Sequence, residues 1–276
     1  MKRREMLLTT GAAVLGLSAF PLRWVSADDK KKPKILYFTK SAGFVHSVVN
    51  REGKPLAFSE KVLTELGAKN GFEVVCSQDA AVFDGDLAQF DLIAFYTTGE
   101  PLSAPQKEKF LGAITAGKPF VGIHCATDTF HSKNDNEIDP YIAMIGGEFK
   151  GHGEQQKAKM KVVSPHFPGV KDLGEGFEML EEWYAGKNFA KDMHVILLQE
   201  TKGMKGDMYH RPDFPATWAK MSGKGRVFYT SMGHREDVWE NKKFQDVLLG
   251  GIAWALGNAQ ADIKPNLEQV APHANG

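Results

Sequence analysis

The chain has 276 residues, of which 42% are hydrophobic and 25% charged, and its 34 basic and 34 acidic side chains give a formal net charge of zero. This length fits one large globular domain or two small ones, with enough chain to bury a substantial core. The balanced charge excludes a general basic surplus for nucleic acid or for anionic membranes, so we expect no nucleic-acid partner.

Residues 1–27 resemble an export signal. Arg3 and Arg4 precede an apolar stretch over residues 6–20, and small residues follow up to Ala27. The pair of arginines is similar to a twin-arginine signal, and this resemblance implies export of an already folded protein. We expect cleavage near Ala27, a periplasmic location and no stable membrane insertion of the mature chain. An ordinary secretory signal and an uncleaved anchor stay open as alternatives.

The first half of the mature chain alternates between apolar runs and helical patterns. Purely apolar runs, rather than alternating ones, are typical of strands buried on both faces of a sheet. The β-α-β order therefore predicts an α/β fold with a mostly parallel sheet and helices on both faces. We predict strands within residues 32–44, 72–79, 90–100 and 119–125 and helices within 56–71 and 103–118.

The second half is less regular and contains several shorter strand patterns. Some of these strands alternate partially, so we expect antiparallel pairs at a sheet edge. One domain is expected over residues 28–258, followed by a loose polar tail over residues 259–276. We predict a helix within 134–149 that ends at Gly146, strands within 155–163, 177–185, 193–200 and 216–231, and a final helix within 241–258.

Four histidines fall in loops that such a sheet can bring together. His46, His124 and His234 each follow a predicted strand, and His152 lies in a glycine-rich loop. Ligands of open α/β sheets bind at the carboxyl ends of the parallel strands. We therefore expect at least three of these four side chains to meet in one pocket at that edge.

Several stretches together resemble the ThuA-like (trehalose utilisation) family, which is related in fold to the class I glutamine amidotransferases. They are "ILYFTKSAGFVHS", "VGIHCATDTF", "GGEFKGHG", "EEWY" and "GKGRVFYTSMGHREDVWENKKFQDVLLGGIAWALG". The resemblance covers roughly residues 33–257. It implies a flavodoxin-like, doubly wound fold and a link to oxidative sugar metabolism, in which disaccharides pass through 3-keto intermediates.

The stretch "GIHCATD" stands where an amidotransferase carries the turn G-x-C-x-G. His124 takes the place of the nucleophile, Cys125 is shifted by one position, and Ala126 replaces the final glycine. A shift of one residue at a sharp turn points a side chain elsewhere, so we do not expect glutamine amidotransferase chemistry and interpret Cys125 as a packed thiol. The turn instead resembles a family pattern G-x-H-x-x-x-D, in which Asp128 is the final residue.

Two mechanisms are compatible with these residues. In the first, His46, His124, His152 and His234 bind a divalent, zinc-like transition metal, which polarises a sugar oxygen as a Lewis acid. In the second, no metal binds, and His124 and His234 act as general acid and base with Asp128 or a glutamate.

A small carbohydrate is the expected substrate of this site. His46, His152, Glu182, Trp183 and Trp239 are the candidate binding residues, and Glu181 and Glu182 are expected to face opposite ways on a strand. Converging histidines favour an enzyme, namely a carbohydrate-active hydrolase, lyase or isomerase that acts on a 3-keto-glycoside or a related sugar. A non-catalytic carbohydrate-binding or scaffold protein on the same fold stays an alternative.

Overall fold

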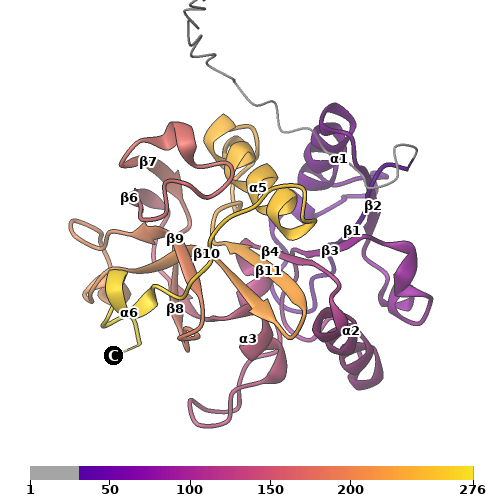
Figure 1. The fold of residues 1–276 in the computed structure, drawn as a ribbon, viewed down its shortest axis with the longest axis horizontal. Helices are drawn as coiled ribbons and strands as arrows, with labels where there is room; N and C mark the ends of the chain where they lie inside the picture. Colours follow the sequence, from indigo (N-terminus) through magenta and orange to yellow (C-terminus); the bar gives the residue numbers. More distant parts are fainter. Residues whose placement is uncertain (1–30, 276) are drawn as a thin grey trace, which may run out of the picture.

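The computed structural model describes residues 31–275, and the expected export signal of residues 1–27 lies outside this part of the chain. A nine-stranded sheet runs through the centre of the described part (Figure 1). One half of it is parallel and consists, in spatial order, of β2 (Glu73–Ser77), β1 (Lys34–Phe38), β3 (Leu92–Phe95), β4 (Phe120–Ile123) and β11 (Gly225–Thr230). The other half is antiparallel and continues with β10 (Phe214–Ser222), β9 (His194–Gln199), β6 (Gln156–Val162) and β7 (Gly176–Glu181).

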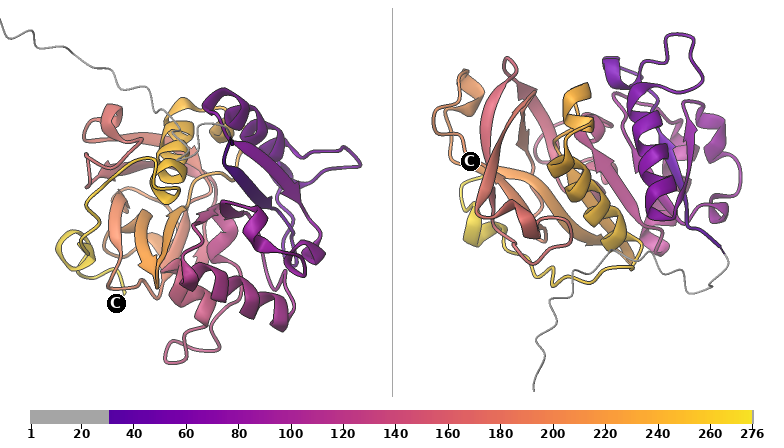
Figure 2. Two further views of the ribbon diagram at one scale, coloured as in Figure 1. Left: turned by 45° about the vertical axis from the view of Figure 1, so that its right-hand side comes forward. Right: turned by 90° about the horizontal axis from the view of Figure 1, so that it is seen from above.

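Helices cover both faces of the sheet. Three of them, α1 (Phe58–Asn70), α4 (Glu236–Trp239) and α5 (Lys242–Ala255), pack together on one face, while α2 (Ala104–Ala116) and α3 (Pro140–Ile145) lie on the other (Figure 1). Both views of Figure 2 show the indigo α1 and the gold α5 on the same side of the strands. The predicted α/β, doubly wound fold is therefore confirmed. No helix within residues 31–275 is both long and apolar enough to cross a membrane.

Short elements complete the chain. A separate two-stranded antiparallel sheet pairs β5 (Glu148–His152) with β8 (Tyr184–Lys187). Single turns of 3₁₀ helix occupy η1 (Ser47–Val49), η2 (Ala80–Phe83), η3 (Leu87–Gln89), η4 (His124–Thr127), η5 (Lys171–Leu173) and η6 (Asp207–Tyr209). The last element is α6 (Leu267–Val270).

The burial of the strands explains why the two halves of the sheet differ. Every residue of β3 and β4 is buried, as expected for strands with helices on both sides. In β6 the side chains of Ala158, Met160 and Val162 are buried, while the lysines between them are exposed. This alternation leaves one face of β6 open to solvent, which suits an antiparallel strand near the edge of the sheet.

Capping residues stand at the ends of α2 and α3, and the predicted stop at Gly146 is confirmed. Ser103 and Gln106 cap the start of α2 reciprocally, since each side chain bonds the backbone N–H of the other residue. Asp139 accepts a hydrogen bond from the N–H of Tyr141 at the start of α3, and Gly146 ends that helix in the left-handed conformation.

The C-terminal tail is packed against the domain, which corrects the expectation of a loose segment. Leu267, Ala271 and Ala274 are buried, and α6 lies beside β9. The side chain of Asn275 also bonds both the N–H and the carbonyl of Phe189, at 2.8 and 2.9 Å. The tail is mostly polar, so hydrophobic periodicity did not predict that it packs. Side-chain hydrogen bonds to the backbone hold it in place.

Candidate metal centre

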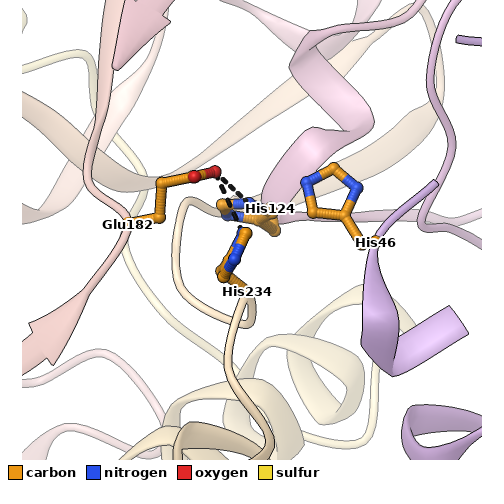
Figure 3. Close-up of side chains that lie close together, drawn as sticks. All are labelled: His46, His124, Glu182 and His234. Carbon is orange, nitrogen blue, oxygen red and sulfur yellow. Dashed lines mark ion pairs between the residues drawn. The ribbon is translucent and has the colours of Figure 1, made fainter. Parts of the chain in front are cut away.

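Four side chains from distant parts of the sequence meet at the carboxyl edge of the parallel strands (Figure 3). His46 follows β1, His124 comes directly after β4, His234 follows β11, and Glu182 lies between β7 and β8. One ligand atom from each of the four residues lies within 4.8 Å of the others. We call these four residues the His₃Glu cluster.

The turn after β4 holds His124 in a fixed orientation. Its backbone has φ of +46°, which is unusual for a residue other than glycine and marks a sharp turn where the strand passes into η4. Its Nδ1 lies 2.7 Å from the carbonyl oxygen of Ser231. Because a carbonyl only accepts, Nδ1 carries the hydrogen, and the lone pair of Nε2 therefore faces the cluster.

Three imidazole nitrogens in the cluster are buried without a hydrogen-bond partner: Nδ1 of His46, Nε2 of His124 and Nδ1 of His234. Oε2 of Glu182 lies 3.0 Å from Nδ1 of His234 and 3.6 Å from Nε2 of His124, at ion-pair distance but outside hydrogen-bond geometry. Buried polar atoms nearly always have a hydrogen-bond partner, so three buried nitrogens without one, beside a carboxylate, indicate that the site binds a further group. Three imidazoles and one carboxylate are a donor set that suits zinc and similar transition ions, and the cluster could hold such an ion.

The electrostatics of the cluster favour the ligand forms of most of its members. Burial, together with the neighbouring His124 and His234, lowers the pKa of His46 to about 2. Burial also lowers the pKa of His124, whose ring is completely enclosed. Although burial alone would raise the pKa of Glu182, the contacts with His124 and His234 lower it far below the ordinary value. His46 and His124 are thus neutral imidazoles beside an ionised carboxylate, the protonation states that metal binding requires.

His234 behaves differently from the other two imidazoles. Burial acts to lower its pKa, but the adjacent carboxylates, Glu182 above all, outweigh burial and raise it. His234 is thus the imidazole of the cluster that retains a proton most readily.

Glu181 holds the loop that carries His234. Its Oε2 accepts hydrogen bonds from the N–H groups of Gly233 and His234, at 2.8 and 3.2 Å, and Oε1 accepts one from the N–H of Glu182 at 2.8 Å. Burial raises the pKa of Glu181 to about 7, although these bonds act in the opposite direction. The two neighbouring glutamates therefore differ in orientation: Glu182 enters the cluster, and Glu181 orders the backbone behind it.

His152 lies at the rim of the cluster instead of among the four converging residues. Its ring is half-exposed, and its Nδ1 lies 3.4 Å from Oε1 of Glu182. The carbonyl of Gly153 accepts a hydrogen bond from Nδ1 at 3.1 Å, so the lone pair of His152 is on Nε2. As a fourth imidazole ligand, which the sequence suggested, His152 does not fit this position, because β5 ends here and directs it to the outside.

Asp128 is not among the four residues of the cluster. Its carboxylate lies 2.7 Å from Nε2 of His131, and Nδ1 of His131 lies 3.2 Å from the buried Glu148. These three residues line a separate polar cavity of about 750 Å³. Of the two carboxylate partners that the sequence left open for His124, Asp128 or a glutamate, the one that lies beside its ring is a glutamate, Glu182.

Trp183 and Trp239 are fully buried, so neither ring offers a face to a sugar. The indole N–H of Trp183 bonds the carbonyl of Gln156, and that of Trp239 bonds the carbonyl of Gly233, at 3.0 and 2.8 Å. Their expected role in substrate binding is corrected to one in packing, because both rings are enclosed in the core.

Cys125 is also buried, and burial raises the pKa of its thiol well above the usual value. A thiol that stays protonated is a poor nucleophile. The position next to His124 therefore carries a packed side chain.

Sequence reasoning missed the groups that orient the cluster. Ser231 acts through its carbonyl oxygen, which no sequence pattern identifies. Tyr184 places its ring 4.2 Å from that of His124 and its hydroxyl 3.4 Å from Nε2 of His46. The "EEWY" segment was the available signal, because strand alternation brings Glu182 and Tyr184 to the same side.

The fold and the cluster together define a class: doubly wound α/β proteins with a His₃Glu cluster at the carboxyl edge of the sheet. A family model described as "ThuA: Trehalose utilisation" matches residues 34–255. The chain therefore belongs to the ThuA family, whose description links it to sugar metabolism.

Solved structures with the same fold are distant in sequence. A ThuA-like protein from Bacteroides uniformis is 21% identical with a TM-score of 0.67, and the match covers 84% of this chain and 95% of that one. A ThuA-like protein from Parabacteroides merdae is 19% identical with a TM-score of 0.63, over 84% and 92% of the two chains. A β-galactosidase from Bacillus circulans is 10% identical with a TM-score of 0.52, over 85% of this chain but 32% of the enzyme. At these identities the likeness concerns the fold alone.

Proposed function

We propose that this protein is a carbohydrate-active enzyme whose His₃Glu cluster binds a divalent transition-metal ion. The observation that carries the proposal is the convergence of three buried, unpartnered imidazole nitrogens on one carboxylate. His46, His124, His234 and Glu182 would be the ligands. The membership of the ThuA family supports a sugar as the substrate.

The surrounding residues are arranged to support such a centre. Ser231 fixes the tautomer of His124, and Glu181 fixes the loop of His234, which are the roles that the neighbours of metal ligands usually have. A bound ion would supply Lewis-acid polarisation of a sugar carbonyl or hydroxyl oxygen.

The reaction that we propose is cleavage of a 3-keto-glycoside by elimination. His152, half-exposed at the rim with a free Nε2, is the candidate base that removes a proton from the carbon next to the keto group. The electron pair of that C–H bond forms a carbon–carbon double bond, and the glycosidic C–O bond breaks. The departing oxygen takes up a proton, which releases an alcohol and an unsaturated keto sugar.

Elemental analysis and a substrate assay test this proposal together. We expect about one equivalent of a transition metal in the purified protein, and loss of both metal and turnover of a 3-keto-glycoside in His124→Ala. His166→Ala is the matched control, because His166 is exposed and lines a different cavity, to which none of the four cluster residues contributes. Turnover that survives His124→Ala contradicts the proposal. A metal-free protein whose turnover depends on His124 and Glu182 supports the acid/base mechanism instead, and saccharide binding without turnover supports a binding protein.

We further propose that the protein is exported with cleavage after Ala27. The motivation is the order of charged, apolar and small residues at the N-terminus. N-terminal sequencing of the periplasmic fraction should begin at Asp28. A full-length product in the cytoplasm contradicts the proposal.

A further inference from the structure

An exposed aromatic side chain stands directly beside the His₃Glu cluster. Phe44 is 66% exposed, and its neighbour Val45 is 52% exposed. Elsewhere in residues 31–275 the exposed large apolar side chains are Ile138 and Met221, at 38% and 39%. Isolated apolar residues on a surface are ordinary, but two adjacent ones at the rim of a polar site indicate a contact surface.

Phe44 is in ring contact with the cluster itself. Its ring meets that of His46 edge to face, with centroids 4.9 Å apart, and His46 in turn packs against His124 and His234. Among residues 31–275, the other aromatic residues in ring contact with these histidines are Tyr96 and Tyr184, and both are buried. Phe44 is therefore the aromatic neighbour of the cluster that a ligand can reach.

The loop that carries Phe44 is firmly anchored to the residues after β3. The hydroxyl of Thr98 donates to the carbonyl of Phe44 at 2.9 Å and accepts from the N–H of Gly43 at 3.1 Å, while the carbonyl of Thr98 accepts from the N–H of Ala42 at 3.0 Å. Gly99 has φ of +65°, and a Cβ there would lie 2.9 Å from the carbonyl carbon of Ala42. The close approach of the two loops thus requires glycine.

The other end of the loop is also held. The hydroxyl of Ser47 donates to Oε1 of Glu236 at 2.6 Å, which ties the segment after His46 to the segment after His234. An aromatic ring that is exposed on a rigid loop loses little conformational freedom when a ligand covers it. Such preorganisation is typical of binding residues.

We propose that Phe44, with Val45 beside it, is the stacking platform for a pyranose ring of the substrate. One face of a pyranose ring consists of C–H groups, which pack on the electron-rich face of an aromatic ring, while its hydroxyls reach polar side chains such as Glu182 and His152. This inference rests on the proposed function, since it takes the cluster to be the reaction centre. Phe44 would thus have the sugar-stacking role that Trp183 and Trp239 cannot have, because both indoles are buried.

Calorimetric titration of the full-length protein tests the platform. The probes are α,α-trehalose and methyl β-D-glucopyranoside, with the acyclic polyol sorbitol as a ligand that has no ring face. We expect Phe44→Ala to raise the Kd of the pyranosides about tenfold or more, because it removes the stacking surface. Phe44→Trp should keep the Kd within about threefold, since it keeps an aromatic face. Met221→Ala is the matched control for loss of an exposed apolar side chain, and it should leave the Kd unchanged.

Metal content and molecular mass, measured on the same preparations, separate the possible failures. A normal metal content with equal Kd values for wild type and Phe44→Ala overturns the platform alone. Absence of metal with a raised Kd in Phe44→Ala contradicts the proposed metal centre and supports the platform. The platform is also overturned if the wild type shows no saturable binding of either pyranoside. A change of oligomeric state in Phe44→Ala at an unchanged Kd would assign Phe44 to a contact between two copies and overturn it as well.

Discussion

Glu181 and Glu182 are neighbours in the chain, yet their environments give them different functions. Glu182 is ionised and lies between two imidazoles. Glu181 is enclosed and accepts hydrogen bonds from three backbone N–H groups. Glu181 orders the loop of His234 without being one of the four residues of the cluster. Mutation of such a positioning residue should weaken the site without abolishing it.

We expect Glu181→Gln to lower metal affinity and turnover about 10–100-fold, the range typical of residues that orient metal ligands. The amide oxygen of glutamine can still accept hydrogen bonds. The amide NH₂ group, however, is a donor, so it cannot accept from the backbone N–H groups that the other carboxylate oxygen binds. Competition with a chelator measures the affinity. Glu178→Gln, on the exposed face of the same strand, is the control. An unchanged affinity in Glu181→Gln would show that the loop needs no such anchor.

Cys125→Ala should keep most of the activity. The thiol is enclosed and its pKa is raised by burial, so it contributes volume and not reactivity. We expect a loss of about 1 kcal/mol in the free energy of unfolding from the small cavity. Steady-state kinetics and denaturant titration measure the two effects, with Cys76→Ala as the control. A fall in turnover by several orders of magnitude would identify a cysteine nucleophile.

At the scale of elements, a buried ion pair joins the start of α1 to β1. Glu60 is fully buried and accepts hydrogen bonds from Nε and Nη2 of Arg51, each at 2.9 Å. It also accepts from the hydroxyl of Thr39, at the end of β1, and from the N–H of Ala57. This carboxylate thus fixes the helix against the strand that leads to His46.

Arg51→Ala should lower the free energy of unfolding by about 3 kcal/mol, since it leaves a buried carboxylate without its cation. Arg51→Lys should recover only part of this loss, because an ammonium cannot replace the two-pronged contact. Lys54→Ala, which breaks an exposed pair with Glu52, should cost at most about 0.5 kcal/mol. Equal midpoints for Arg51→Ala and Lys54→Ala in a denaturant titration would refute the assignment.

The contact of η4 with β5 should depend on pH through His131. The hydrogen bond to Asp128, followed by that to Glu148, raises the pKa of His131. Because the pKa of His131 is higher in the folded state, protonated His131 contributes to the free energy of unfolding. This contribution is complete below about pH 6.5, the pKa of an unfolded histidine, and is lost as the pH rises through the pKa of the folded state. His131→Asn should therefore destabilise the protein more at pH 5.5 than at pH 8.5. The difference should be at most about 1 kcal/mol, because the ring is half-exposed. Equal destabilisation at both pH values would exclude a charged His131.

Elements with a strong apolar signature could be predicted from the sequence, and the contacts of their loops could not. The runs at β1, β3 and β4 and the stop at Gly146 are visible because burial and helix ends select residue types. The histidines that follow strands were found by the same logic. Trp183 and Trp239 were misassigned, since the sequence does not show whether an indole faces a sugar or the core.

At the scale of the whole molecule, the C-terminal tail packs against β9 in the antiparallel half of the sheet. The side-chain amide of Asn266 bonds both the N–H and the carbonyl of Val195 in β9, at 2.6 and 3.1 Å. Deletion of residues 259–276 should lower the free energy of unfolding by about 3 kcal/mol or more, because it exposes apolar surface and backbone groups of β9. Asn275→Ala alone should cost about 1 kcal/mol. A truncated protein with an unchanged melting temperature would contradict the packed tail.

The order of the His₃Glu ligands along the chain has a consequence for biosynthesis. His46 is made early, but His234 follows β11, which must insert between β4 and β10 before the cluster is complete. If the cluster binds a metal ion as proposed, all four ligands are together only after β11 has paired with β4 and β10, so loading of the ion would follow the folding of the sheet. If the twin-arginine route exports the finished protein, the ion would come from the cytoplasm where the chain folds. The cell's supply of metals there, and not that of the periplasm, would then determine which ion the centre holds.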